Sequence, residues 1–307
     1  MTNISASIVK ELREMTAAGM MDCKKALAET GGDIESAVDL LRKKGLAKAA
    51  KKSGRTAAEG LVGVATNAGL GALVEVNSET DFVARNPEFQ AFAKTSASLA
   101  LQSDGNLDAL LAAPMADGGT VSEMLSNLVA KIGENMAVRR TAVLSASPGV
   151  VVSYVHNAVA PELGKIGALV AIQSSADADK LAALGKQLAM HVVATSPLAL
   201  DVSSLDPNVV ARERAILADQ ARESGKPENV VEKMIEGRMR KFYEESVFLS
   251  QVFVIDSETR IEKVLENAGK EFDAAVEIAG YLRFAVGEGI DKPTEDFAAE
   301  VNLVAGN

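Results

Sequence analysis

The sequence contains few of the residue types on which most active sites depend. Its 307 residues include one cysteine, two histidines and no tryptophan. The single cysteine, Cys23, excludes an internal disulfide framework and is typical of a reducing cytoplasm. Cys23 lies far in sequence from both histidines, so a buried thiol is favoured over a cysteine–histidine nucleophile. His191, in a mainly apolar stretch, is expected to be a core histidine.

The sequence also lacks the signatures of membrane, metal and nucleotide sites. No apolar run approaches the ~20 residues that span a bilayer, and the first residues resemble neither a signal peptide nor a transit sequence. The cysteine and histidine spacings of metal sites are missing. Gly69-Leu70-Gly71 begins like a dinucleotide fingerprint, but a strand follows it where a helix is needed. We therefore expect a cytoplasmic protein that is not an enzyme and binds no cofactor, metal or nucleotide.

Charge of one sign dominates, with one local exception. The net charge of −10 disfavours a general polyanion binder. The stretch 41–55 nevertheless has no acidic residue and seven basic ones, namely Arg42, Lys43, Lys44, Lys48, Lys51, Lys52 and Arg55. A solvated helix face continuing into a tether is the favoured interpretation. A patch for RNA or an acidic partner is the alternative, and its binding would weaken steeply with salt.

Apolar spacing predicts three short helices within residues 1–50. Their apolar stripes are Ile8, Leu12 and Met15, then Cys23 and Leu27, then Ile34, Val38 and Leu41. Breaks fall at 16–19 and 30–32, and Asp33 is a suitable N-cap for the third helix. A bundle of this size is plausible as a docking module.

The middle of the chain contains an internal duplication. Each copy is a predicted hairpin with a Gly-Ala-Leu-Val return strand, followed by a helix. The copies begin at Gly60 and Gly149, and their helices are expected over 89–101 and 178–194. The turn of the second hairpin, 158–165, is expected to be long. We therefore predict two related α+β subdomains.

The second copy carries an insertion. Asp206-Pro207 opens a helix that stops near residues 224–227, and a second helix over 228–243 returns. Such a hairpin commonly makes an interaction arm or an oligomer contact. Strands are then expected at 248–254 and 276–284. An amphipathic helix over 294–304 is expected to close the chain.

The polar stretch 77–83 holds an aromatic residue that needs a reason. In one interpretation Thr80 or Asp81 caps a short helix and Phe82 tucks beneath it. In the other, Asp81 and Phe82 are presented to a partner. The local sequence favours the cap.

Several stretches, in order along the chain, resemble the bacterial translation elongation factor Ts family. They are Gly-Met-Met-Asp-Cys-Lys-Lys-Ala-Leu at 19–27, Thr-Asp-Phe-Val-Ala-Arg at 80–85, Lys-Ile-Gly-Glu-Asn at 131–135, Tyr-Val-His at 154–156, Glu-Gly-Arg-Met-Arg-Lys-Phe at 236–242 and Arg-Phe-Ala-Val-Gly-Glu-Gly at 283–289. Each is weak alone, but together they cover nearly the whole chain.

The resemblance implies an α+β fold with a ubiquitin-associated-like (UBA-like) three-helix module. The expected divisions are 1–54 for that module with its linker, 55–146 and 147–286 for two core subdomains with antiparallel sheets, about 197–236 for the inserted helical hairpin, and 287–307 for a C-terminal helix module. The hairpin carries self-association in some family members.

The resemblance also implies a function in protein synthesis. Family members are guanine-nucleotide exchange factors that bind the GDP complex of elongation factor Tu and promote GDP release by disturbing its magnesium site. The matched residues expected to intrude are Thr80, Asp81, Phe82 and Val83. Other expected partner contacts are Lys24, Ile132, Gly133 and His156.

Two other classes of function stay open at the level of sequence. A non-catalytic translation or RNA-associated adaptor would use the basic stretch 41–55. A small-molecule enzyme would need a substrate pocket built around His156 or His191, and it is strongly disfavoured.

Overall fold

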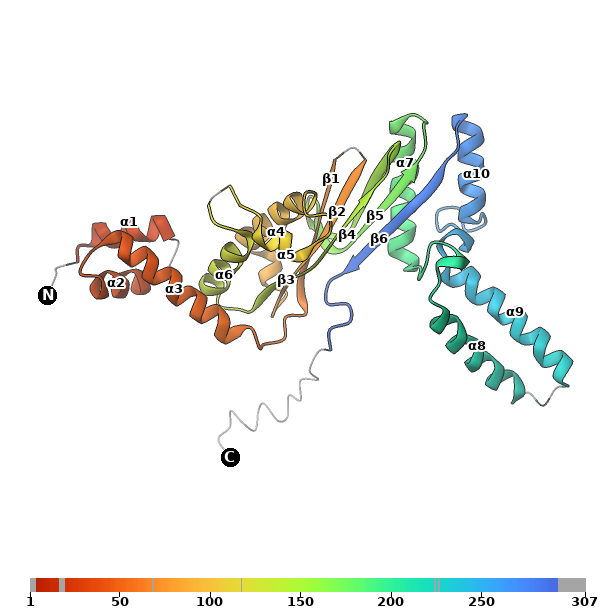
Figure 1. Cartoon of the computed structure of the whole chain (residues 1–307), viewed down its shortest axis with the longest axis horizontal. Helices are drawn as coiled ribbons and strands as arrows, with labels where there is room; N and C mark the ends of the chain where they lie inside the picture. Colours follow the sequence, from red (N-terminus) through yellow and green to blue (C-terminus); the bar gives the residue numbers. More distant parts are fainter. Residues whose placement is uncertain are drawn as a thin grey trace.

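The computed structural model describes residues 4–16, 20–67, 69–116, 118–223, 225 and 227–291. The molecule is elongated, with a small helical module at one end and a helical hairpin at the other (Figure 1). A sheet with helices on its outer faces lies between them. The helix expected over 294–304 lies outside the described residues. No helix among the described residues is long and apolar enough to cross a membrane.

The N-terminal module consists of α1 (Ala6–Thr16), α2 (Met20–Glu29) and α3 (Ile34–Lys52). Buried Leu12, Cys23 and Leu27 form its centre, as the spacing predicts. Asp33 caps α3 by accepting the backbone N–H of Ser36 at 2.7 Å. The prediction of a tether is wrong, because α3 continues as one helix through Lys52.

The core contains a six-stranded sheet made of two three-stranded halves. The first half is β1 (Glu59–Asn67), β2 (Leu70–Ser78) and β3 (Met136–Ser145); the second is β4 (Gly149–Ala160), β5 (Leu163–Gln173) and β6 (Glu277–Ala285). Pairing is antiparallel throughout, and the halves meet where Val62 and Gly63 of β1 face Gly164 and Leu163 of β5. Each half is a hairpin, then helices, then a third strand, which agrees with the predicted duplication.

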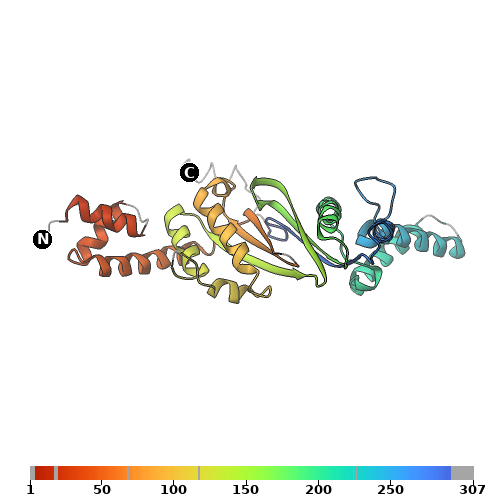
Figure 2. The ribbon, with the colours of Figure 1, turned by 90° about the horizontal axis from the view of Figure 1, so that it is seen from above.

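Helices cover the outer face of each half-sheet. On the first half lie α4 (Pro87–Ala100), α5 (Leu107–Ala112) and α6 (Val121–Ile132); on the second lie α7 (Ala178–Thr195) and α10 (Ile261–Phe272). Side chains alternate between the two faces of each strand. They therefore form three apolar cores, one under the helices of each half and one between the half-sheets. In β5, for example, Val170 faces the helices while Leu169 faces the other half-sheet. The two half-sheets therefore pack face to face, with a helical layer outside each one (Figure 2).

Matching glycines of the two copies make this packing reciprocal. A Cβ atom on Gly71 would lie 3.1 Å from the Leu169 methyls, and one on Gly167 would lie 3.3 Å from a Leu73 methyl. Each Gly-Ala-Leu-Val segment thus receives the leucine of the other copy above its own glycine. The duplication is consequently visible in the packing as well as in the strand order.

The inserted hairpin consists of α8 (Pro207–Arg222) and α9 (Glu228–Ser246). Valine, isoleucine and methionine side chains hold the two helices together. The predicted range of about 197–236 includes the lead-in before α8 and stops within α9, whose last residue is Ser246. The short 3₁₀ helix η2 (Val202–Ser204) lies in that lead-in.

Two local predictions for the second half are wrong. Residues 248–254 contain the 3₁₀ helix η3 (Phe248–Ser250) and a loop, not a strand. Both edges of β5 are already paired with β4 and β6, so the apolar character of this stretch reflects burial of Phe248 and Phe253 against α7. The turn 158–165 is short, because β4 continues to Ala160 and β5 begins at Leu163.

Candidate partner-binding site

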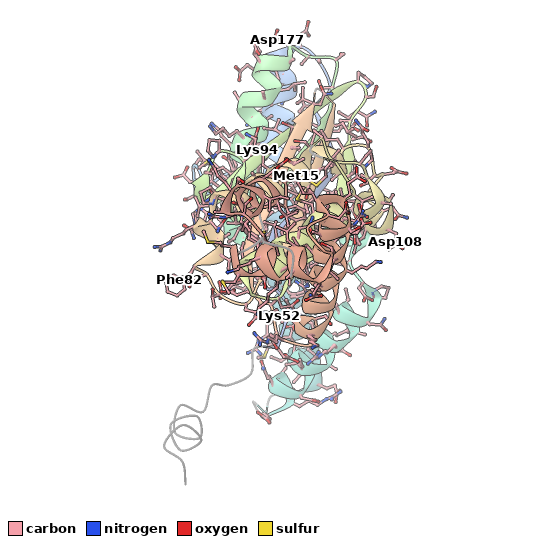
Figure 3. The ribbon with its side chains drawn as sticks, turned by 90° about the vertical axis from the view of Figure 1, so that its left-hand side faces the viewer. Met15, Lys52, Phe82, Lys94, Asp108 and Asp177 are labelled. Carbon is pink, nitrogen blue, oxygen red and sulfur yellow. The ribbon has the colours of Figure 1, made fainter. Side chains whose placement is uncertain are left out.

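The stretch after β2 forms an exposed loop, which we call the Phe82 loop (residues 79–83). The Phe82 side chain is 75% exposed, more than any other large hydrophobic residue that the structure describes. It projects from the edge of the body in Figure 3. The next residue, Val83, is only 4% exposed and begins the 3₁₀ helix η1 (Val83–Arg85). An apolar ring is therefore presented to solvent beside a buried anchor.

The capping interpretation of this loop is wrong. No side-chain hydrogen bond caps the start of η1. The turn is closed by the backbone instead, since the carbonyls of Asp81 and Phe82 accept the N–H groups of Ala84 at 3.2 Å and Arg85 at 3.1 Å. The Phe82 ring does not tuck beneath the helix. Asp81 is exposed as well, so both residues face outward.

A second loop, the α6 exit loop (residues 133–135), lies against the Phe82 loop. Gly133 ends α6 in the left-handed conformation (φ 91°), and its N–H donates to the carbonyl of Val129 at 3.0 Å. A side chain there would be strained, so glycine suits this position. Ile132, just before it, packs on the first-half core. Two predicted contact residues therefore lie beside the exposed ring's loop.

The two loops exchange carboxylate–amide hydrogen bonds. Glu134 accepts the backbone N–H of Thr80 at 2.9 Å and the Thr80 hydroxyl at 2.7 Å. Glu79 in turn accepts the backbone N–H of Asn135 at 2.5 Å. Each loop thus supplies a carboxylate to the backbone of the other. Hydrogen bonds to charged acceptors are shorter and stronger than neutral ones.

The end of α3 joins the same junction. The Lys52 ammonium donates to the carbonyl of Gly133, and the Asn135 side-chain amide donates to the carbonyl of Arg55 at 2.7 Å. Arg55 also lies 3.4 Å from the Glu79 carboxylate. Elsewhere in the basic stretch, Arg42 pairs with Glu123 and Lys44 with Glu29. Much of this positive charge therefore serves contacts within the chain.

His156 lies near the same end of the sheet on β4. Its β5 partner is Ile166. The neighbouring Lys165 pairs with Glu59 at 3.0 Å, and Glu59 faces Ser78 at the base of the Phe82 loop. The His156 side chain is exposed, with its Nδ1 atom 3.2 Å from the Tyr154 hydroxyl. His156 is therefore accessible to a partner.

Lys24 is separate from this junction. It is an exposed residue of α2 in the N-terminal module. The candidate residues are therefore spread over the module and one end of the core. Such a distribution suits a broad docking surface better than a pocket.

The remaining candidates for chemistry are enclosed. His191 is fully buried, shares a 2.9 Å hydrogen bond with Gln251 and accepts the backbone N–H of Val254 at Nδ1. Burial lowers its pKa, and the hydrogen bond that its Nε2–H donates to the Gln251 side-chain oxygen opposes that shift. Cys23 is buried. Among the described residues no group of three or more acidic, histidine or cysteine side chains could hold a metal ion.

One cavity of about 700 Å³ lies between the N-terminal module and α6. Its lining includes Met15 and Leu41 from the module and Met124 and Leu128 from α6, and it contains neither histidine. It therefore gives no support to a substrate pocket around His156 or His191.

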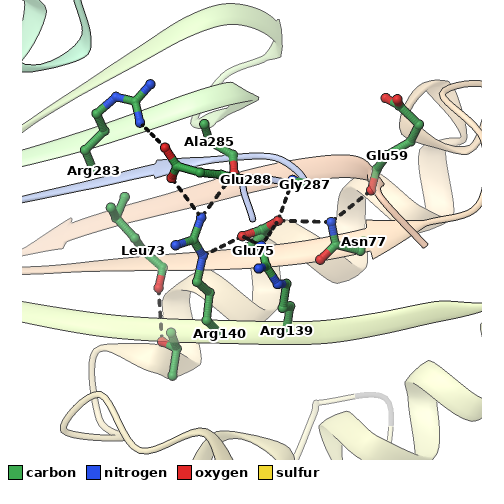
Figure 4. A network of polar contacts seen from close by, with 11 residues as sticks. Glu59, Leu73, Glu75, Asn77, Arg139, Arg140, Arg283, Ala285, Gly287 and Glu288 are labelled. Atoms are coloured by element: carbon green, nitrogen blue, oxygen red, sulfur yellow. Dashed lines mark hydrogen bonds and ion pairs between the residues drawn. The ribbon is translucent and has the colours of Figure 1, made fainter. Parts of the chain in front are cut away.

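A buried polar network holds the segment that follows β6, near the C-terminal end of the described residues (Figure 4). The Glu75 carboxylate, 0% exposed, accepts hydrogen bonds from Arg139, Arg140 and the backbone N–H of Gly287. Arg140 also donates to the carbonyl of Ala285 at 3.1 Å. The segment leaving β6 is thereby attached to β2 and β3 of the first half.

The sequence alone assigns no role to Glu134 or Glu79, and it marks Arg55 only as one of the seven basic residues of the stretch 41–55. The matched stretch 131–135 includes Glu134, but its contact with Thr80 spans 54 residues of sequence. No local pattern reveals such a pairing. Only the end of β2 and the end of α6, brought together by the fold, show it.

Comparison with known proteins adds a family match. The family model described as Elongation factor TS matches residues 79–288. The protein named Elongation factor Ts from Rhodospirillum centenum is 60% identical over 307 residues, covering 100% of both chains. Those of the same name from Rhodospirillum rubrum and Maricaulis maris are each 58% identical, covering 98% or more of both chains.

Proposed function

The chain belongs to the elongation factor Ts family, and we propose that it releases GDP from elongation factor Tu by inserting Asp81 and Phe82 beside the partner's magnesium site. Family membership implies the role of nucleotide exchange factor in translation elongation, without covalent chemistry of its own. The insertion is the finer part of the proposal, and it rests on the resemblance of residues 80–83 to the family's core signature.

The observation that supports this mechanism is the exposure of Phe82. Burying a phenylalanine side chain stabilises a protein by about 1.5–3 kcal/mol. Here that gain is forgone, since the ring is 75% exposed while Val83 beside it is buried. The gain becomes available only when a partner covers the ring. Asp81, also exposed, adds a negative charge at the same tip.

The chemistry of the partner's nucleotide explains why a small intrusion suffices. Mg²⁺ requires near-octahedral geometry and bridges nucleotide phosphate oxygens to the protein in GTPases. Displacing one element that supports the magnesium ion therefore weakens the binding of GDP strongly. By linkage, GDP weakens binding of the exchange factor by the same ratio. Such a factor needs a wide docking surface as well as a local wedge.

We assign the docking surface to residues around and beyond the Phe82 loop. Ile132 and Gly133 lie at the adjoining α6 exit, His156 is exposed at the same end of the sheet, and Lys24 is exposed on α2. Lys24 and His156 are exposed, so a partner can contact both side chains directly. Association of two copies through α8 and α9 is a further proposal, supported by exposed Val209 and Ile216 on α8. Analytical ultracentrifugation of the purified chain would show a monomer if this is wrong.

The decisive measurement is release of fluorescently labelled GDP from elongation factor Tu. Wild-type chain should accelerate release catalytically. Phe82→Ala should lose roughly 2 kcal/mol of the effect, about thirtyfold in rate, as expected for an aromatic anchor. Ile255→Ala, which shortens another exposed apolar side chain (48%), serves as the matched control. Unchanged exchange by Phe82→Ala would refute the wedge.

A further inference from the structure

We propose that Glu134 is a positioning residue that holds the Phe82 loop in the conformation that reaches the partner, an inference that rests on the proposed function. Its carboxylate takes both donors of Thr80, the N–H at 2.9 Å and the hydroxyl at 2.7 Å. Thr80 precedes Phe82 by two residues. Glu134 therefore controls the backbone from which the exposed ring projects.

The ring itself has little else to hold it. Phe82 is 75% exposed, so its direction depends on the backbone on either side. On the far side Val83 is buried in the first-half core, and the η1 turn follows. On the near side the Ser78 hydroxyl donates to the carbonyl of Thr80 at 2.9 Å, and Glu134 binds the other polar groups of Thr80. Removing Glu134 would break two of the three hydrogen bonds described for Thr80.

Glu134 is itself well placed to act as an anchor. The left-handed Gly133 directs the chain sharply out of α6, and the next residue but one, Asn135, is buried. The backbone N–H of Asn135 donates to Glu79, while the Asn135 side chain donates to the carbonyl of Arg55. The Glu134 carboxylate thus projects from a loop fixed on both sides.

Loss of this anchor should affect presentation of the ring more than docking. The contacts proposed for Lys24 and His156 lie elsewhere and are retained. If only a fraction of molecules presents Phe82 correctly, the exchange step falls in proportion to that fraction. An interaction used only in that step lowers kcat and leaves KM nearly unchanged. A residue that merely docked would instead raise KM.

The test compares Glu134→Ala with Glu134→Gln. The glutamine oxygen can still accept from Thr80, and its amide can donate to the Thr80 hydroxyl oxygen. The matched control is Glu266→Ala on α10, which removes an exposed carboxylate paired with Lys263 and Lys270. For each variant, kcat and KM are measured for GDP release from elongation factor Tu. Hydrogen exchange of the Thr80 amide is measured by NMR in the chain alone.

We expect Glu134→Ala to lower kcat roughly tenfold, since both charge-assisted hydrogen bonds to Thr80 are lost. KM should change less than about threefold, and Thr80 amide exchange should accelerate at least about tenfold. Glu134→Gln should have a kcat within roughly threefold of wild type. The control Glu266→Ala should have the kcat of wild type.

Three results would overturn the proposal. One is accelerated hydrogen exchange of the Thr80 amide in Glu134→Ala while kcat is unchanged. Another is a raised KM in Glu134→Ala while kcat is unchanged. The third is a Thr80 amide whose exchange does not depend on residue 134. If Glu134→Ala fails to fold, Thr80→Val removes the hydroxyl donor alone and should lower kcat by a smaller factor. Wild-type chain without exchange activity would refute the proposed function instead, and the amide measurement would still decide whether Glu134 holds the loop.

Discussion

The Arg140 guanidinium lies 2.5 Å from the Glu75 carboxylate across the β2–β3 pair, and Glu75 has no exposed surface. A carboxylate so placed must be fully compensated, because an unpaired buried charge is costly. Arg139, the Asn77 side-chain amide and the backbone N–H of Gly287 supply further hydrogen bonds to it.

Glu75→Ala should therefore destabilise the chain by about 3 kcal/mol, because removing one partner leaves the others uncompensated. The measurement is the urea unfolding midpoint with the slope held constant. Glu59→Ala is the matched control on β1, since Glu59 and its partner Lys165 both remain about 30% exposed. A shift no larger for Glu75→Ala than for Glu59→Ala would contradict this prediction.

Stability should fall in mild acid because of His191. Burial lowers the pKa of this side chain below its ordinary value of 6.5 in the folded state. The unfolded chain consequently binds the proton first as pH falls. The contribution of His191 is complete above about pH 6.5 and is lost progressively below it, down to the folded pKa.

Urea unfolding between pH 7.5 and 5 would measure this loss. His191→Gln keeps a polar group near Gln251 but cannot titrate, so its stability should depend less on pH over the same range. An identical pH slope in wild type and His191→Gln would exclude the histidine as the cause.

Tyr281 should resist deprotonation. Burial raises the pKa of its hydroxyl to about 12, and the hydroxyl donates to the carbonyl of Pro197 at 2.7 Å. The folded state therefore favours the neutral phenol, and this contribution is present below pH 10 and lost between about pH 10 and 12. In an ultraviolet titration of the folded protein, wild type and Tyr281→Phe should differ in phenolate signal only as the pH approaches about 12. A difference between the two proteins that is already complete near pH 10 would contradict it.

Close packing of the half-sheets should make Gly71 intolerant of a side chain. A Cβ atom there would lie 2.6 Å from a Val151 methyl. Gly71→Ala should cost about 1–3 kcal/mol by overpacking. Shortening the neighbour in the double variant Gly71→Ala with Val151→Ala should recover part of that loss relative to the two single effects. Strict additivity in thermal unfolding would refute direct contact as the cause.

The duplicated hairpins could be predicted from sequence because their alternation and glycines are local. Gly60 and Gly149 begin equivalent strands, and both have positive φ. Long-range pairing could not be read in the same way. The apolar stretch 248–254 has the composition of a strand, yet β5 has no edge left for it once β6 pairs there.

The candidate site shows the same division between local and distant information. The stretch 80–83 could be singled out by its aromatic residue in a polar loop. Its hydrogen-bonding partner could not, because Thr80 satisfies its donors with Glu134 and caps nothing nearby. Capping rules consider only hydrogen bonds between a side chain and backbone groups close to it in sequence. Here the Thr80 hydroxyl instead donates to a carboxylate from a distant helix exit.

The bond between Glu75 and the N–H of Gly287 joins positions 212 residues apart. During synthesis, β2 therefore leaves the ribosome long before the last strand that completes its environment. The first half can form its helices and hairpin early. Its inner face, however, stays uncovered by Phe284 and its neighbours until the end of the chain is made. The Glu75 carboxylate therefore gains its last backbone donor only after 212 further residues have been made.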